Sequence, residues 1–187
     1  MKKIVLFASG SGTNVENIIH YFSTSQNVCV EAIFTNNPNA GVIEKARNAS
    51  VRCVIFTKEE QNSGKLLIQI DQIKPDLIVL AGFLWMFPKD ILTKYITVNI
   101  HPALLPKYGG KGMYGHHVHQ AVFDNLEKST GITIHYVNEK YDEGAIIFQK
   151  EVSIVDCTSV DEIAQKVHQL EYDYFPSVIE SILKSVV

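Results

Sequence analysis

Residues 96–106 read ITVNIHPALLP, and the expected fold is built around them. The run begins with apolar, β-branched residues, which is typical of a buried strand. Asn99 and His101 are two residues apart, so both side chains should point to the same face of that strand. Pro102 cannot donate a ladder hydrogen bond and is expected to end the strand. The sequence therefore predicts an amide and an imidazole together at the carboxyl end of a strand, where open α/β sheets bind ligands.

This pair of side chains suits acyl transfer. A carboxamide donates to the oxyanion that forms at a carbonyl, and an imidazole exchanges a proton near neutral pH. A single strand histidine is more often a core residue. Here the neighbouring Asn99 and the turn at Pro102 favour the catalytic interpretation.

Composition limits the class of protein. A chain of 187 residues that is 46% hydrophobic predicts one domain over residues 1–187. The net charge of -3 gives no electrostatic case for a nucleic acid or an anionic membrane as partner. Cys29, Cys53 and Cys157 have no CxxC spacing, which favours a reduced cytoplasmic location, with Cys29 and Cys53 buried. No apolar run approaches the ~20 residues that span a membrane, and the first run stops at Gly10, too early for a signal peptide.

The remaining pattern predicts an α/β fold with a single doubly wound, Rossmann-like sheet. Apolar runs at residues 4–8, 28–35, 52–56 and 76–82 alternate with helical patterns, which indicates parallel strands covered by helices on both faces. Two further strands at 129–137 and 145–152 resemble a hairpin, so the sheet should be mostly parallel but mixed. A long final helix is expected to kink or restart at Pro176.

A glycine-rich turn at residues 9–14 joins the first strand to a helix. Such a turn presents free N–H groups and a helix dipole to a phosphate. Val15 stands where a dinucleotide fingerprint requires a small residue, so a monophosphate fits better than NAD. An ordinary tight turn capped by Thr13 or Asn14 explains the motif alone equally well.

Three other segments carry candidate groups. Residues 83–87 (FLWMF) follow a strand and either fill the core or form a slot for a flat ring system. Asp142 lies in a polar loop; beside an imidazole it would raise the imidazole pKa, although a solvated turn residue is the better expectation. His116, His117 and His119 open a helix without a carboxylate or cysteine at ligand spacing, so surface and loop packing is expected and no metal site.

Together these segments resemble the phosphoribosylglycinamide formyltransferases, a family of folate-dependent formyl transferases. The resemblance covers nearly the whole chain, and its carriers are residues 10–14, 79–83, 99–108, 131–137 and 142–144. The run Asn-Ile-His-Pro-x-Leu-Leu-Pro is its most specific part. The resemblance implies direct transfer of the formyl group of a co-substrate, 10-formyltetrahydrofolate, to the amine of 5-phosphoribosylglycinamide (glycinamide ribonucleotide) in purine biosynthesis, without a metal.

The resemblance also implies roles for individual residues. Asn99 and a protonated His101 would hold the oxyanion, and Asp142 would keep that imidazole charged and help to move the proton. His135 would support them from the adjacent strand. The N-terminal part would bind the ribonucleotide, through Gly12, Thr13 and Asn14 with His168 and Glu171 from the last helix. The C-terminal part would carry the catalytic loop and the folate site, whose implied residues are Lys58, Leu84, Trp85, Met86, Phe87, Asn99, Asn138, Glu139, Lys140, Tyr141 and Asp142. A cytoplasmic monomer or homodimer is expected.

The chain departs from the familiar members at three places. Trp85 stands where they carry an arginine, Lys58 is a less certain match to a basic residue, and the loop 109–115 is longer. Three alternatives remain. A methionyl-tRNA formyltransferase would add a basic C-terminal domain, and a formyltetrahydrofolate deformylase-like hydrolase would add an N-terminal one. The third is a non-catalytic Rossmann nucleotide-binding module, which would not need the pair formed by Asn99 and His101.

Overall fold

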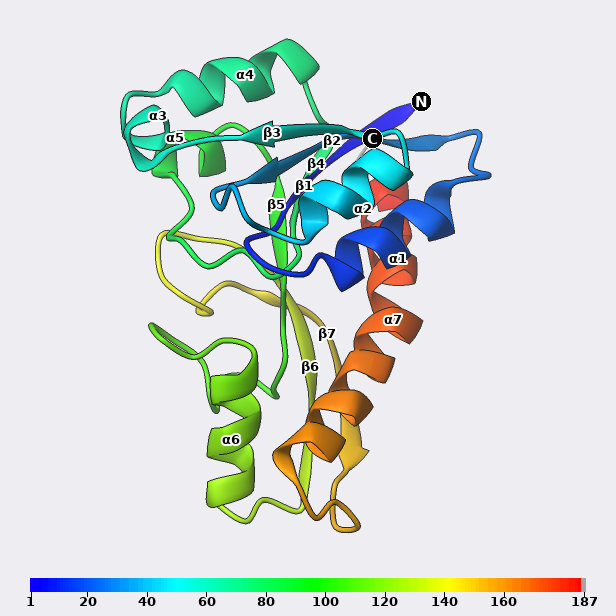
Figure 1. Ribbon diagram of the computed structural model, residues 1–187, viewed down its shortest axis with the longest axis vertical. Coiled ribbons are helices and arrows are strands. Elements are labelled where there is room, and N and C mark those ends of the chain that lie inside the picture. Colours follow the sequence, from blue (N-terminus) through cyan, green and yellow to red (C-terminus); the bar gives the residue numbers. More distant parts are fainter. Residues whose placement is uncertain (186–187) are drawn as a thin grey trace.

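The computed structural model describes residues 1–185 and contains one mixed sheet (Figure 1). Within these residues seven strands lie in the order β3-β2-β1-β4-β5-β6-β7. The first five strands in the chain pair in parallel. β6 pairs antiparallel with β5, and β7 pairs antiparallel with β6. The strands are β1 (Lys2–Phe7), β2 (Val28–Thr35), β3 (Arg52–Ile55), β4 (Leu77–Leu80), β5 (Thr97–His101), β6 (Ser129–Tyr136) and β7 (Ile146–Ser153). The predicted mostly parallel, mixed sheet is confirmed.

Helices cover both faces of the sheet. They are α1 (Thr13–Phe22), α2 (Val42–Asn48), α3 (Lys58–Asn62), α4 (Lys65–Ile73), α5 (Lys89–Leu92), α6 (His116–Asp124) and α7 (Val160–Ser185). β1 shows why two cores form, because alternate residues point to opposite faces. Ile4 and Leu6 pack in the core shared with α1 and α7, whereas Val5 and Phe7 pack in the core under α4 and α5. Both faces are therefore buried, and the doubly wound prediction is confirmed.

The molecule is elongated, with two ends joined by α7 (Figure 1). β1–β5 and helices α1–α5 form one end, and β6, β7 and α6 form the other. α7 packs against α1, α6 and β6, so it spans both ends. This arrangement brings the loops after β1, β4 and β5 next to the segments that follow β6 and precede α6.

Two local expectations, a restart of the last helix at Pro176 and burial of Cys29 and Cys53, are wrong. α7 is a single helix with Pro176 buried inside it, so the proline neither ends nor restarts the helix. Cys29 and Cys53 are half-buried rather than buried, because their strands lie toward the outer edge of the sheet. Among the described residues, no helix combines the length and the apolar character that crossing a membrane requires.

Candidate active site

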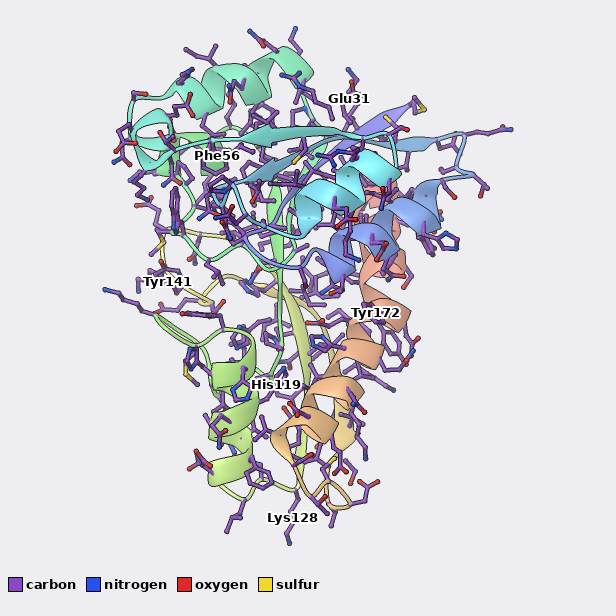
Figure 2. The ribbon with its side chains drawn as sticks, viewed as in Figure 1. Glu31, Phe56, His119, Lys128, Tyr141 and Tyr172 are labelled. Carbon is purple, nitrogen blue, oxygen red and sulfur yellow. The ribbon has the colours of Figure 1, made fainter. Side chains whose placement is uncertain are left out.

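A cavity of about 530 Å³ lies at the carboxyl ends of β1, β4 and β5. It is lined by the glycine-rich turn, the segment after β4, the end of β5, the loop before α6, the loop after β6 and the middle of α7. The lining residues are 10–14, 80–87, 99–102, 110–115, His119, His135, 137–138, 140–142, His168 and Glu171. Figure 2 labels two of them, Tyr141 on the loop after β6 and His119 on α6.

Asn99 and His101 both line this cavity from β5, as the two-residue spacing predicts. Asn99 lies opposite His135 in the antiparallel pairing of β5 with β6. Nδ1 of His135 donates to the carbonyl of Tyr136 at 2.9 Å, so Nε2 is the ring nitrogen that can accept a hydrogen bond. The Asn99 amide nitrogen is 3.1 Å from that Nε2 and donates to it. His135 therefore holds the Asn99 amide in a fixed orientation.

His101 is held between a carbonyl and a carboxylate. Its side chain is 3% exposed; Nε2 donates to the Tyr108 carbonyl at 2.7 Å, and Nδ1 is 3.5 Å from Oδ2 of Asp142. Burial lowers the pKa of His101 below 6.5, against the opposing effects of the Asp142 charge and the Tyr108 carbonyl. The expectation of a protonated His101 at the oxyanion therefore stays a prediction about the reacting complex. Withdrawal from water outweighs the carboxylate, and the neutral ring is favoured at pH 7.

Asp142 reaches this site from the loop between β6 and β7. Its side chain is only 11% exposed, so it is not the solvated turn residue that sequence alone favours. The N–H of Gly110 donates to Oδ2 at 2.9 Å, and Oδ1 is 3.6 Å from Nε2 of His135. Burial acts to raise the pKa of Asp142, but the nearby rings of His135 and His101 and the Gly110 N–H together hold that pKa below its usual value. The carboxylate is thus ionised at neutral pH.

The glycine-rich turn forms an uncapped helix start. α1 begins at Thr13, and Gly12 precedes it with φ of 75° and no side-chain cap, so the interpretation as an ordinary capped turn is excluded. A Cβ on Gly12 would lie 2.6 Å from Cβ of Val42. The absence of a side chain thus lets α2 approach closely and leaves the first-turn N–H groups facing the cavity.

The ribonucleotide residues expected on the turn and on α7 are brought together. Nδ2 of Asn14 and Nδ1 of His168 each donate to Oε2 of Glu171, both at 2.9 Å. Glu171 is only 5% exposed. The hydrogen bond with Glu171 raises the pKa of His168 against the effect of burial. These three side chains therefore form one polar cluster on the cavity wall, in which Glu171 is buried and His168 is exposed.

The apolar segment 83–87 does both things that the sequence allows. Phe83 and Phe87 pack on Phe7 in the core, with ring centroids 5.4 and 5.0 Å apart. Leu84 and Met86 are 41% and 36% exposed at the cavity. The two phenylalanines therefore anchor the segment, and the residues between them present apolar surface to the cavity.

The other expected folate residues divide between the cavity and the surface. Asn138, Lys140 and Tyr141 line the cavity, and Trp85 lines it while packing edge-on against Phe56. Lys58 does not line it, but its Nζ lies 4.8 Å from the centre of the Trp85 ring. Glu139 is also outside the lining and pairs with Lys89 at 2.8 Å on the surface.

The sequence analysis misplaced one polar residue of the lining. His119 is 2% exposed, so its expected place on the helix surface is wrong, whereas His116 and His117 are exposed. The signal was present, because His119 precedes the buried Val122 by three residues and so shares its helix face. Within residues 1–185, no three His, Cys, Asp or Glu side chains are grouped in a way that could hold a metal ion.

Comparison with known proteins agrees with this geometry. Residues 2–179 match the family described as formyl transferase. The chain is 35% identical over 190 residues to a chloroplastic phosphoribosylglycinamide formyltransferase of Arabidopsis thaliana, with 97% of this chain and 65% of that protein covered. It therefore spans less than two thirds of that relative. It is 33% identical to the Bacillus subtilis phosphoribosylglycinamide formyltransferase over 191 residues, with 98% and 95% covered.

A solved structure shows the same arrangement. The crystal structure of glycinamide ribonucleotide transformylase 1 from Geobacillus kaustophilus matches with a TM-score of 0.88 and 30% identity, covering 98% of this chain and 99% of that one. The match to the family model extends over nearly the whole chain and includes every residue of the cavity. The chain belongs to the formyl transferase family.

Proposed function

We propose that this chain is one formyl transferase domain that moves the formyl group of 10-formyltetrahydrofolate to the amine of 5-phosphoribosylglycinamide in purine biosynthesis. The observation that carries the proposal is the meeting of Asn99, His101 and Asp142 in one cavity. An uncapped helix start lies at one part of that cavity and an apolar segment at another. The relatives described above bear the name of this activity.

The two substrates are assigned to different walls. The phosphate is proposed to bind the first turn of α1 at Gly12, Thr13 and Asn14, where free N–H groups and the helix dipole favour an anion. His168 and Glu171 would contact the rest of the ribonucleotide. The pterin is proposed to lie on the apolar residues of segment 83–87 and under the loop 138–142, which includes Glu139. Lys58 is proposed to contact the outer folate tail.

The chemistry then follows from the fixed atoms. The amine nitrogen attacks the formyl carbon, a C–N bond forms, and the formyl oxygen becomes negative. Asn99 donates to this oxygen; one such donor is typically worth ~3 kcal/mol of barrier. Because Tyr108 fixes Nε2 of His101 as a donor, Nδ1 is the acceptor and takes the proton that the amine loses.

The resulting imidazolium lies 3.5 Å from the Asp142 carboxylate, which stabilises it. It is a second donor to the oxyanion. When the tetrahedral intermediate collapses, the bond from carbon to N10 of the folate breaks and the proton passes to that nitrogen. The products are the formylated ribonucleotide and tetrahydrofolate.

The test uses the purified full chain with 10-formyltetrahydrofolate, followed by folate absorbance, with and without the ribonucleotide. The expected result is turnover that requires the ribonucleotide, with formylglycinamide ribonucleotide identified by mass spectrometry. Turnover without the ribonucleotide would support the hydrolase, and tight binding without turnover would support the nucleotide-binding module. His101→Ala should remove most of the rate, whereas the exposed His117→Ala serves as the matched control.

The cytoplasm is the proposed compartment, and a monomer or homodimer is the proposed assembly. Both substrates are small molecules, so neither a nucleic acid nor a membrane is required as a partner. Light scattering on the purified chain, combined with localisation of a tagged copy, tests these two points.

A further inference from the structure

His119 is a buried polar side chain to which the proposed mechanism gives no role. It projects from α6, is 2% exposed and lines the cavity (Figure 2). Within the described part of the chain, neither ring nitrogen has a hydrogen-bond partner, and both nitrogens are buried. Buried polar groups are nearly always hydrogen-bonded in native proteins. The side chain therefore lacks a partner that a bound molecule could supply.

The surroundings of His119 contain a second such group. Its ring is 6.0 Å from the ring of His168, which donates to Glu171. Asn14 donates to the same carboxylate through Nδ2, but its Oδ1 is buried with no partner among residues 1–185. We call Asn14, His119, His168 and Glu171 the polar corner. Three atoms of the polar corner are free to form a hydrogen bond with a bound molecule: the side-chain oxygen Oδ1 of Asn14 and the two ring nitrogens of His119.

The charge of the polar corner limits what can bind there. Burial, with a smaller contribution from His168, lowers the pKa of His119 to about 4, so the ring is neutral at physiological pH. A neutral imidazole offers one donor and one acceptor. The Glu171 carboxylate disfavours an anion in the same place. An uncharged group that both donates and accepts, such as a hydroxyl, meets these conditions.

The position of the polar corner selects among hydroxyl-bearing groups. Asn14 belongs both to the corner and to the first turn of α1, where the phosphate is proposed to bind. A hydroxyl group next to that phosphate belongs to the sugar of the ribonucleotide. We infer that His119 binds a ribose hydroxyl of the phosphorylated substrate and thereby selects a ribonucleotide over its deoxy counterpart. The inference rests on the proposed function and adds a specificity residue to it.

The test compares wild type, His119→Leu and His119→Gln on glycinamide ribonucleotide and on its 2′-deoxy and 3′-deoxy analogues. His119→Leu should raise the KM for the ribonucleotide roughly tenfold and leave the KM for 10-formyltetrahydrofolate unchanged. Wild type should bind one deoxy analogue more weakly, and this difference should disappear in His119→Leu. His119→Gln keeps a donor and an acceptor. It should therefore recover part of the affinity for the ribonucleotide and part of the preference over the deoxy analogue. His116→Leu, an exposed histidine three residues earlier on α6, is the matched control and should change neither constant.

Thermal unfolding shows whether each variant is folded. If His119→Leu does not fold, His119→Gln is used for the comparison in its place. The inference is overturned if His119→Leu keeps the full preference for the ribonucleotide, or if only the folate KM rises. Titration calorimetry with the ribonucleotide and its two analogues measures the same preference without turnover. A chain that binds with this preference but transfers no formyl group would contradict the proposed function and leave His119 as a ribose ligand.

Discussion

The amide nitrogen of Asn99 lies 3.1 Å from Nε2 of His135, directly across the antiparallel pair of β5 and β6. Because the other ring nitrogen donates to the Tyr136 carbonyl, Nε2 is an acceptor and the amide has one orientation. The reversal of strand direction at β6 thus aligns an oxyanion donor before any substrate binds. Donors that are already aligned do not need to reorganise during the reaction.

Replacement of this donor gives the most direct test of the proposed chemistry. Asn99→Ala should lower kcat by 10²–10³-fold, which corresponds to about 3–4 kcal/mol, because the oxyanion loses its fixed donor. The KM for the ribonucleotide and the unfolding temperature should change little. Asn39→Ala, at an exposed position, should have no effect. A change confined to KM would contradict the role given to Asn99.

The pH profile should distinguish a neutral from a charged His101. Burial lowers the pKa of this imidazole below 6.5, so the base is unprotonated at pH 7 and kcat/KM should fall only as the pH drops through the lowered pKa. Asp142→Asn removes the charge that opposes this effect, and the acid limb should move to still lower pH while the maximal rate falls. The measurement is kcat/KM across the acid and neutral range. A rate that rises on acidification below pH 7 would instead require an imidazolium in the free protein.

Two glycines with the same backbone conformation separate strain from close packing. Gly12 and Gly64 have φ of 75° and 78°, but only Gly12 has an atom of Val42 at 2.6 Å from the position of a Cβ. Gly64→Ala should cost about 1–2 kcal/mol of unfolding free energy from backbone strain and leave kinetics unchanged. Gly12→Ala should cost more and should also raise the KM for the ribonucleotide, because α1 must move away from α2. Urea unfolding and steady-state kinetics measure both quantities.

The proposed contact between the pterin and segment 83–87 can be tested at Leu84, the most exposed apolar residue of that segment. Leu84 is 41% exposed in the cavity, and Ile68 is 60% exposed on α4, outside it. Leu84→Ser should raise the KM for 10-formyltetrahydrofolate several-fold, since apolar contact with a ring system is lost. Ile68→Ser is the control for surface polarity. An equal rise of the folate KM in both variants would argue against a contact between Leu84 and the pterin.

His119 should make the protein less stable in acid. Its pKa is 6.5 when exposed and about 4 in the folded chain, so below pH 6.5 the unfolded state binds a proton that the folded state does not. Stability should therefore fall as the pH drops from 6.5 to about 4, by roughly 3 kcal/mol in all. His168 has a raised pKa and acts in the opposite direction, since its contribution is present below pH 6.5 and lost as the pH rises through its folded pKa. Urea unfolding of wild type and His119→Leu at pH 7 and pH 4.5 should show a smaller loss in the variant.

Sequence patterns predicted those parts of the site whose geometry is set within a single strand, turn or helix. The spacing of Asn99 and His101 follows from the period of a strand, and the turn at residues 10–14 follows from strand, glycines and helix in sequence. Both were found where expected. The continuous apolar run at residues 4–8 likewise predicted a strand covered on both faces, and β1 packs in a core on each face.

The remaining features depend on contacts between distant segments. Asp142 is buried only because Gly110 and His135 surround it, and nothing near residue 142 in the sequence indicates this. The neutral state of His101 likewise depends on its total burial, which the adjacent carboxylate does not overcome. His119 looked like part of a surface histidine cluster until α6 was placed against α7. Segment 83–87 was ambiguous because its residues divide between core and cavity.

The span of α7 has a consequence for the order in which the protein becomes functional during synthesis. The carboxylate of Glu171 accepts a hydrogen bond from Asn14, although 157 residues separate them. A ribosome must therefore synthesise nearly all of the described chain before α7 can complete the lining of the cavity. The nascent sheet can form strand by strand, but no partial product of translation should hold the ribonucleotide as the finished protein does.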